Sequence, residues 1–158
     1  MLSSADIQAV QGEAVVESKA SPQSSNGVTM SECLFRAATP AKSVSLALAL
    51  PGKQSPRDFW RKHFHSEDAS KSDKPAKPAK ARPQNDKKQE KEEEETRPRA
   101  IGGVGDEAFW MGSPISGALY VLRGNSFIRV SVGGVREESA RIKKSVALAH
   151  LALKRIQR

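Results

Sequence analysis

Large apolar residues are absent from one stretch in the middle of the chain, residues 67–99. This stretch contains no Val, Ile, Leu, Met, Phe, Trp or Tyr, but it contains ten basic and nine acidic residues. A segment with nothing apolar to bury cannot offset the entropy lost on ordering. We therefore predict that 67–99 is a disordered loop, charged and rich in Lys, Glu and Pro.

Cysteine and long hydrophobic runs are also scarce. Cys33 is the single cysteine, which excludes an internal disulfide. The longest apolar run, Leu46–Leu50, has five residues, whereas a membrane-spanning helix needs about 20. Met1 leads almost directly into a polar segment beginning at Ser3, which predicts no signal peptide. Taken literally, this places the protein in the cytoplasm.

No catalytic motif stands out. The glycines of 102–105 come before a predicted strand rather than a helix, which is the wrong context for a dinucleotide-binding loop. His63 and His65 point in different directions on a helix, so they do not form a pair of metal ligands. Cys33 lies within an apolar alternation, which indicates burial rather than an activated thiolate. We predict no catalytic, cofactor-binding or metal-binding residues, no cofactor and no enzymatic activity.

The apolar residues fall into two blocks, 1–66 and 100–158. Each block has only about 60 residues, and a domain of that size is marginally stable. Together they have the size of an ordinary single domain. We therefore predict that the blocks are two halves of one α+β domain, joined by the disordered loop.

The hydrophobic pattern predicts the order of the secondary structure elements. Ser3 or Ser4 caps a first helix that Gly12 ends, and Ser55-Pro56 begins a second helix. Residues 21–27 form a cluster of turn formers. The predicted fold is a largely antiparallel sheet of about six strands covered by helices, in the order αβββα–loop–βββα. Its strands cover 14–18, 28–37, 43–50, 108–111, 119–123 and 126–132, and its last helix covers 137–158.

The last helix carries a narrow apolar stripe with residues at spacings of four and three, namely Ile142, Val146, Ala149, Leu153 and Ile156. Leu148 and Leu151 are predicted to point away from this stripe, among basic side chains. Three groups could cover the two leucines: the aliphatic stems of those basic side chains, helix 56–65, or a partner protein. The predicted interaction surface consists of Arg141, Lys144, Leu148, Leu151 and Arg155.

Four aromatic residues have two interpretations. Trp60, Phe64, Phe109 and Trp110 can line a ligand pocket, but aromatic residues at this spacing are more often part of the core. The sequence favours the core interpretation.

The net charge of +8 is concentrated near the C-terminus, where residues 100–158 include nine basic and four acidic side chains. Such a charge can attract nucleic acid or an anionic membrane surface. It can also simply keep a small domain soluble. Because no aromatic–basic nucleic-acid motif accompanies the charge, we regard nucleic acid as an unlikely partner.

Three segments together resemble a known group of proteins: Leu2–Gly12, Ser31–Phe35 and Gly103–Trp110. They are similar to segments of small uncharacterised bacterial exported proteins and lipoproteins, whose architecture is that of the Mog1/PsbP-like α/β/α sandwich. The resemblance covers nearly all of the chain outside residues 67–99. It implies an α/β/α fold and an exported, periplasmic or envelope location.

The resemblance also implies a partner for Cys33. In that group a Cys usually precedes the start of the first helix, and here it would be expected one residue before Met1. We therefore hypothesise that the native N-terminus, with a signal segment and this Cys, is missing, and that Cys33 forms a disulfide with it. A membrane contact would then arise only through such an N-terminal anchor. The alternative is a buried thiol, which is common for Cys.

Together these observations predict a non-enzymatic exported or envelope-associated protein that binds another protein or a small ligand. The alternative is a cytoplasmic accessory protein that contacts nucleic acid through the basic last helix, using Lys143, Lys144, Lys154 and Arg155. Electrostatic binding to nucleic acid weakens steeply with salt, which separates the two hypotheses.

Overall fold

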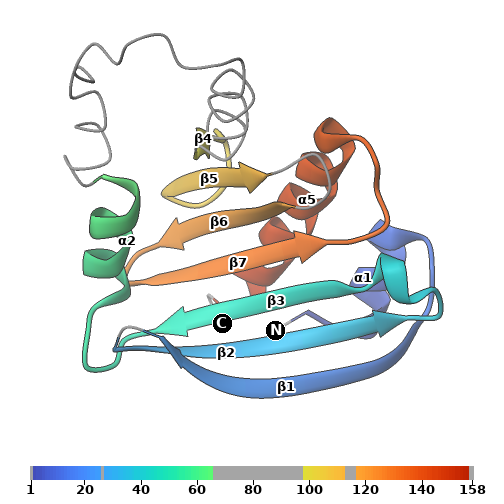
Figure 1. Cartoon of the computed structure of the whole chain (residues 1–158), viewed down its shortest axis with the longest axis horizontal. Coiled ribbons are helices and arrows are strands. Elements are labelled where there is room, and N and C mark those ends of the chain that lie inside the picture. Colours follow the sequence, from blue (N-terminus) through green and yellow to red (C-terminus); the bar gives the residue numbers. More distant parts are fainter. Residues whose placement is uncertain (1, 26, 66–97, 113–116, 157–158) are drawn as a thin grey trace, which may run out of the picture.

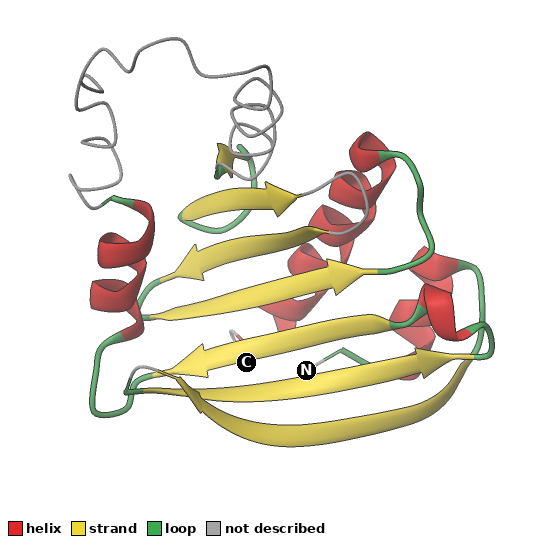
Figure 2. Ribbon diagram, viewed as in Figure 1, coloured by secondary structure: helices red, strands yellow, loops and turns green. Residues whose placement is uncertain are grey.

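The computed structural model describes residues 2–25, 27–65, 98–112 and 117–156. Within these residues the chain forms one antiparallel sheet and three α-helices, which confirms the α+β class (Figure 1, Figure 2). In chain order the elements are α1 (Ser4–Gln11), β1 (Val15–Ser25), β2 (Val28–Ala37), the 3-10 helix η1 (Pro40–Lys42), β3 (Val44–Leu50), α2 (Pro56–Phe64), β4 (Arg99–Ala100), β5 (Glu107–Gly112), β6 (Gly117–Arg123), β7 (Ser126–Val132) and α5 (Glu138–Ile156).

The strands are arranged in the order β1-β2-β3-β7-β6-β5-β4, and every neighbouring pair is antiparallel. The described part of the chain therefore has seven strands rather than about six. The additional strand is β4, which pairs with Phe109 and Trp110 of β5. Arg99 was predicted to belong to the disordered loop, but its backbone adds to the edge of β5. Residues 67–97 of that predicted loop lie outside the described residues.

The two halves of the chain meet in the middle of the sheet. β3 comes from the first half and β7 from the second, and they pair over six residues from Val44↔Val132 to Ala49↔Phe127. The side chains of β3 alternate between the two faces of the sheet, because Val44 and Leu46 contact one hydrophobic cluster and Ala49 contacts another on the opposite face. The sheet is therefore shared by residues from both blocks.

Helices α1 and α5 cover one face of the sheet, which we call the α1/α5 face (Figure 1). At the start of α1 the Ser3 side chain accepts a hydrogen bond from the Asp6 backbone, and the Asp6 carboxylate accepts one from the Ser3 backbone. This reciprocal cap satisfies N–H groups that a helix end leaves unpaired. The core beneath the two helices includes Ile7, Leu119, Val121, Ile128, Val130, Leu148, Ala149 and Leu153.

The face of α5 that packs on the sheet differs from the predicted stripe. We expected Leu148 and Leu151 to point away from the core, but Leu148 is completely buried and Leu151 packs against the same cluster. Ile156, which the stripe included, is exposed. Two small residues explain why the buried face of α5 differs from the predicted stripe. Ser145 and Ala152 are completely buried, so the helix lies close to the sheet along these positions. The stripe was predicted from large apolar residues and therefore does not include them.

Helix α2 lies on the opposite face of the sheet, which we call the α2 face (Figure 1). It therefore does not pack beside Leu148 and Leu151, as the sequence had suggested. Its cluster contains Trp60 together with Phe127 and Leu122 from the second half of the chain. The resulting three layers are α1 and α5, the sheet, and α2.

Strand β1 is longer than predicted. Residues 21–27 were expected to form a turn, but β1 continues to Ser25, which pairs with Val28. The chain reverses at Gly27, whose φ of 79° suits glycine. The pairing with β2 outweighs the local preference of Ser and Pro for turns, and Pro22 is tolerated because β1 is an edge strand. Across the described residues, no helix has the length and apolarity needed to cross a membrane.

Candidate functional site

The five residues of the predicted interaction surface do not form an exposed surface. Arg141 and Leu148 are buried, Lys144 and Leu151 are half-buried, and Arg155 is exposed. The five side chains therefore lie on different sides of α5, some facing the core and others facing solvent. Our prediction of a surface that combines all five is therefore wrong for Arg141 and Leu148.

Two cations of this group hold α1 against α5. The Lys144 ammonium donates a hydrogen bond to Oε1 of Gln11 over 3.1 Å. The Arg155 guanidinium lies 2.7 Å from the Asp6 carboxylate. The pKa of Asp6 is held below its ordinary value, first by the hydrogen bond from the Ser3 backbone and also by the charge of Arg155. Both cations therefore have internal structural partners.

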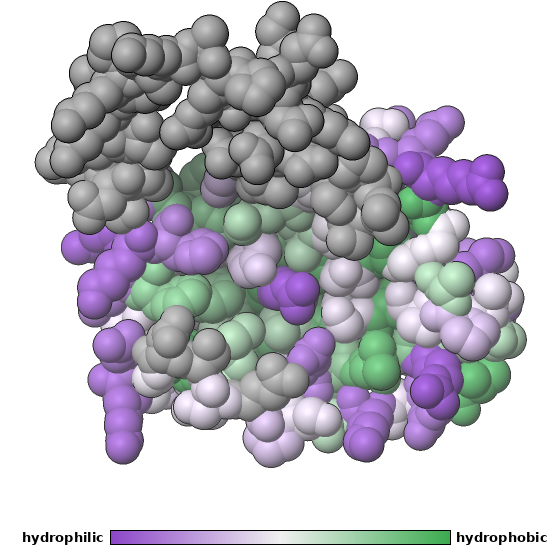
Figure 3. Space-filling view, in the orientation of Figure 1, coloured by the Kyte–Doolittle hydropathy of each residue, from purple (hydrophilic) through white to green (hydrophobic). Residues whose placement is uncertain are grey.

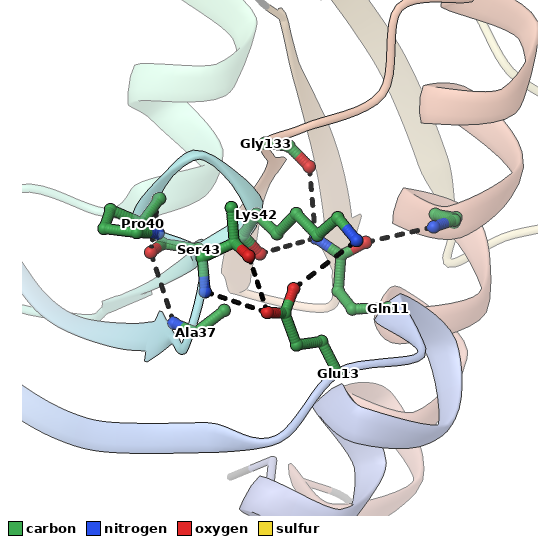
Figure 4. Close-up of polar contacts among 9 residues, drawn as sticks. Gln11, Glu13, Ala37, Pro40, Lys42, Ser43 and Gly133 are labelled. Carbon is green, nitrogen blue, oxygen red and sulfur yellow. Dashed lines mark hydrogen bonds and ion pairs between the residues drawn. The ribbon is translucent and has the colours of Figure 1, made fainter.

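Gln11 is the polar centre of the junction between α1, η1 and the loop before α5 (Figure 4). It is almost completely buried, and its amide nitrogen donates to the carbonyl oxygens of Lys42 (2.8 Å) and Gly133 (3.2 Å). Beside it, the Glu13 carboxylate accepts hydrogen bonds from the side chain and backbone of Thr39, which lower its pKa. A hollow of about 350 Å³ borders this junction. Because its polar groups bind one another, we assign the junction a structural role.

Cys33 lies in β2 on the α1/α5 face, and its side chain is buried in the main hydrophobic cluster. The disulfide implied by the resemblance stays a prediction.

The aromatic residues weighed in the sequence belong to two different faces. Trp110 is buried on the α1/α5 face, with its ring against the backbones of Gly112 and Gly117. A Cβ at Gly117 would lie 2.3 Å from the Trp110 ring, so no larger residue fits there. Trp60 anchors α2 on the other face, with Phe64 and Phe109 4.4 Å and 5.8 Å from its ring centroid. The core interpretation is confirmed for both tryptophans.

A polar contact fixes the end of α2 to β5. The Trp60 indole donates to the Glu107 carboxylate over 2.9 Å, and Nε2 of His65 lies 2.6 Å from the same oxygen. The hydrogen bonds from His65 and then Trp60 hold the pKa of Glu107 below its ordinary value. At its start α2 is held differently from the prediction: the Ser55 hydroxyl does not cap the helix but donates to the side chain of Asn125.

A groove of about 490 Å³ lies along the side of α2. It is lined by Gln54, Phe59, Lys62 and His63, and we call it the α2 groove. Phe59, Lys62 and His63 are three and four residues apart, so the helix presents them on one side. Phe59 also stacks on Phe127 of β7 at 5.6 Å, which fixes the groove against the sheet. The space-filling view shows hydrophobic surface beside α2 that is bordered by hydrophilic side chains (Figure 3).

The sheet continues this surface away from α2. The His63 ring lies 6.5 Å from the ring of Tyr120 in β6, and the Arg129 guanidinium lies 6.0 Å from the same Tyr120 ring on its β7 side. Sequence reasoning missed Phe59, Tyr120 and Arg129 as site residues. One signal was available: Arg129 is the single charged residue of the strand Ser126–Val132, and it lies in the middle of that strand.

In the part of the chain that the structure describes, no group of three His, Cys, Asp or Glu side chains lies close enough to hold a metal ion. The sequence was compared with protein-family models and curated proteins, and the structure with solved structures, and none of these comparisons found a match. The α2 groove is therefore interpreted from its own geometry.

Proposed function

We propose that this protein is a small binding protein and that the α2 groove is its ligand site. The observation that carries the proposal is the groove itself. It combines one aromatic side chain, Phe59, which is supported from behind by the buried Phe127, with the polar side chains of Gln54, Lys62 and His63. Ligand pockets typically have this composition, with apolar surface for affinity and a few polar groups for orientation.

The size of the groove favours a small organic molecule as the ligand. A volume of about 490 Å³ is within the usual range for such pockets, which is roughly 300–1,000 Å³. Two anchors keep Phe59 in place without occupying the groove, because Trp60 points into the sheet cluster and Ser55 bonds to Asn125. The groove is thus formed before a ligand binds, which lowers the entropy cost of binding.

The test uses N-phenyl-1-naphthylamine, a neutral apolar dye whose fluorescence rises in apolar surroundings. We expect saturable binding to the wild-type protein and about tenfold weaker binding to Phe59→Ala, because the aromatic side chain of the groove is lost. The matched control is Val16→Ala, which removes an exposed apolar side chain from β1 and should leave binding unchanged. Equal binding to wild type and Phe59→Ala would place the dye elsewhere and refute the proposal.

The compartment in which this binding takes place is a separate part of the proposal. The resemblance to exported and lipid-anchored bacterial proteins supports an envelope-associated location. Fractionation of cells that express the natural gene, followed by detection of the protein in the periplasm or cytoplasm, tests it.

We do not extend the proposal to nucleic acid. Two of the four cations in that hypothesis have internal partners, since Lys144 bonds to Gln11 and Arg155 pairs with Asp6. Changing Lys143, Lys144, Lys154 and Arg155 together to Glu would therefore disturb the packing of α1 as well as the surface charge.

A further inference from the structure

Arg129 occupies an unusual position for a charged residue. It lies in the middle of β7, and β7 has strands on both sides, β3 and β6. Its side chain points to the α2 face, like those of its neighbours Phe127 and Ser131, because alternate residues of a strand share a face. The cross-strand neighbours of Arg129 are Ala47 on one side and Tyr120 on the other.

The surroundings of Arg129 leave one of its donors without a hydrogen-bond partner. The Nε atom is buried, and no group in the described residues accepts a hydrogen bond from it. A buried donor without an acceptor destabilises the folded protein, because its hydrogen bond to water is lost and not replaced. The Tyr120 ring attracts the guanidinium through its π face, but it does not accept the in-plane Nε hydrogen.

The Tyr120 ring relates Arg129 to the α2 groove. Its centroid lies 6.0 Å from the Arg129 guanidinium carbon and 6.5 Å from the ring centroid of His63, which lines the groove. Tyr120 and Arg129 do not line the groove themselves, so a ligand contacts the guanidinium by extending from His63 along the Tyr120 ring. Arginine presents Nε and Nη in one plane, and this fork matches the two oxygens of a carboxylate.

We infer that the ligand of the α2 groove is an apolar molecule with a single carboxylate, and that Arg129 binds this carboxylate. The inference rests on the proposed function, because it assigns the chemistry of a ligand in that groove. Lys62 also lines the groove, and its ammonium group adds positive potential along the path to Arg129.

The experiment compares two soluble molecules of nearly the same shape, 1-naphthylacetate and its neutral amide, 1-naphthylacetamide, in which an uncharged NH₂ group replaces one carboxylate oxygen. Each is titrated against the wild-type protein loaded with the neutral dye, and dye displacement is measured. We expect the acid to bind about tenfold more tightly than the amide, because a charge-assisted bidentate contact forms only with the acid. In Arg129→Gln this preference should disappear, while binding of the amide stays within about twofold of the wild-type value.

The matched control is Arg36→Gln. Arg36 is an exposed arginine of β2 on the same face, paired with Glu17 at the rim of the sheet, and its loss should preserve the preference for the acid. A second measurement needs no variant: the ¹⁵N–¹H signal of Arg129 Nε should shift on addition of the acid and not of the amide. This keeps the inference testable if Arg129→Gln fails to fold.

The outcomes separate the two proposals. If the wild-type protein binds neither the dye nor the naphthyl compounds, the proposed function is refuted. If it binds acid and amide equally, or if Arg129→Gln weakens both equally, the groove binds apolar molecules and the inference about Arg129 is overturned. If Arg36→Gln also loses the preference for the acid over the amide, the positive charge at the edge of the sheet selects the acid rather than Arg129. That result also overturns the inference about Arg129.

Discussion

The two faces of the sheet are covered to different extents by the described helices. On the α1/α5 face, two helices pack over a cluster that extends from β2 to β5. On the α2 face, one nine-residue helix packs over a smaller cluster at one end of the strands. The strands themselves account for the difference, because β7 presents Ile128, Val130 and Val132 to the first face, whereas on the second face Phe127 is followed by Arg129 and Ser131.

The difference also separates stability from recognition. A face made of large aliphatic residues is stabilised by burying all of them, and it leaves no space for a ligand. A face with small and polar residues beside an aromatic helix has less apolar surface to bury, and a groove remains along α2. Both proposals therefore concern the α2 face, whereas the α1/α5 face is expected to provide most of the folding free energy.

The largest expected effect is a loss of stability on the α1/α5 face. Leu148 is completely buried between α5 and the sheet. Leu148→Ala should lower the free energy of unfolding by about 2–5 kcal/mol, as measured by urea denaturation, because it removes buried methyl groups and leaves a cavity. The matched change on the other face is Leu34→Ala. Leu34 is 42% exposed, so the loss there should be below about 1 kcal/mol. Similar losses at the two leucines would show that the faces do not differ as described.

A smaller and more local effect is expected for Trp60→Ala. Trp60 is the buried anchor of α2 and contacts Phe64 and Phe109. Because α2 covers only one end of the face, it can detach while the rest of the sheet stays folded. Amide hydrogens of α2 should then exchange about 10- to 100-fold faster, while those of β3 and β7 keep their protection. Equal acceleration in the helix and in the central strands would indicate that the whole domain unfolds as one unit.

Much of this architecture could be predicted from the sequence, because it depends on local patterns. The strands predicted over 43–50 and 126–132 and the helix cap at Ser3 all depend on a few neighbouring residues, and each is confirmed. The sharing of one sheet by both halves followed from their size. The length of β1 could not be predicted, since pairing with β2 rather than the composition of β1 determines where it ends.

The candidate site could not be predicted because it depends on which elements meet. Periodicity gave an apolar stripe for α5 but could not show that Ser145 and Ala152 allow the helix to approach the sheet and bury Leu148. The sequence likewise does not show that α2 packs opposite α5. That arrangement brings His63, Tyr120 and Arg129 together from three separate elements.

The smallest expected effect is a pH dependence at the polar contact between α2 and β5. Hydrogen bonds from His65 and Trp60 lower the pKa of Glu107 in the folded protein. A carboxyl with a lowered pKa stabilises the fold above the pKa of the unfolded chain, about 4.3 for Glu. This stabilisation is lost as the pH falls through the lower folded-state pKa. The contact is half exposed, so it should contribute less than either packing change above.

An NMR titration of the Glu107 side-chain carboxyl measures this directly. The wild-type midpoint should lie below about 4.3, and Trp60→Phe should raise it, because phenylalanine fills most of the space of the indole but donates no hydrogen bond. An unchanged midpoint would mean that the indole does not stabilise the carboxylate. The result also bears on the comparison of the two faces. If protonation of Glu107 accelerates amide exchange in α2 but not in the elements of the α1/α5 face, then the two faces are stabilised differently. The α2 face depends on polar contacts that a change of pH weakens, whereas the α1/α5 face depends on apolar packing that pH does not affect.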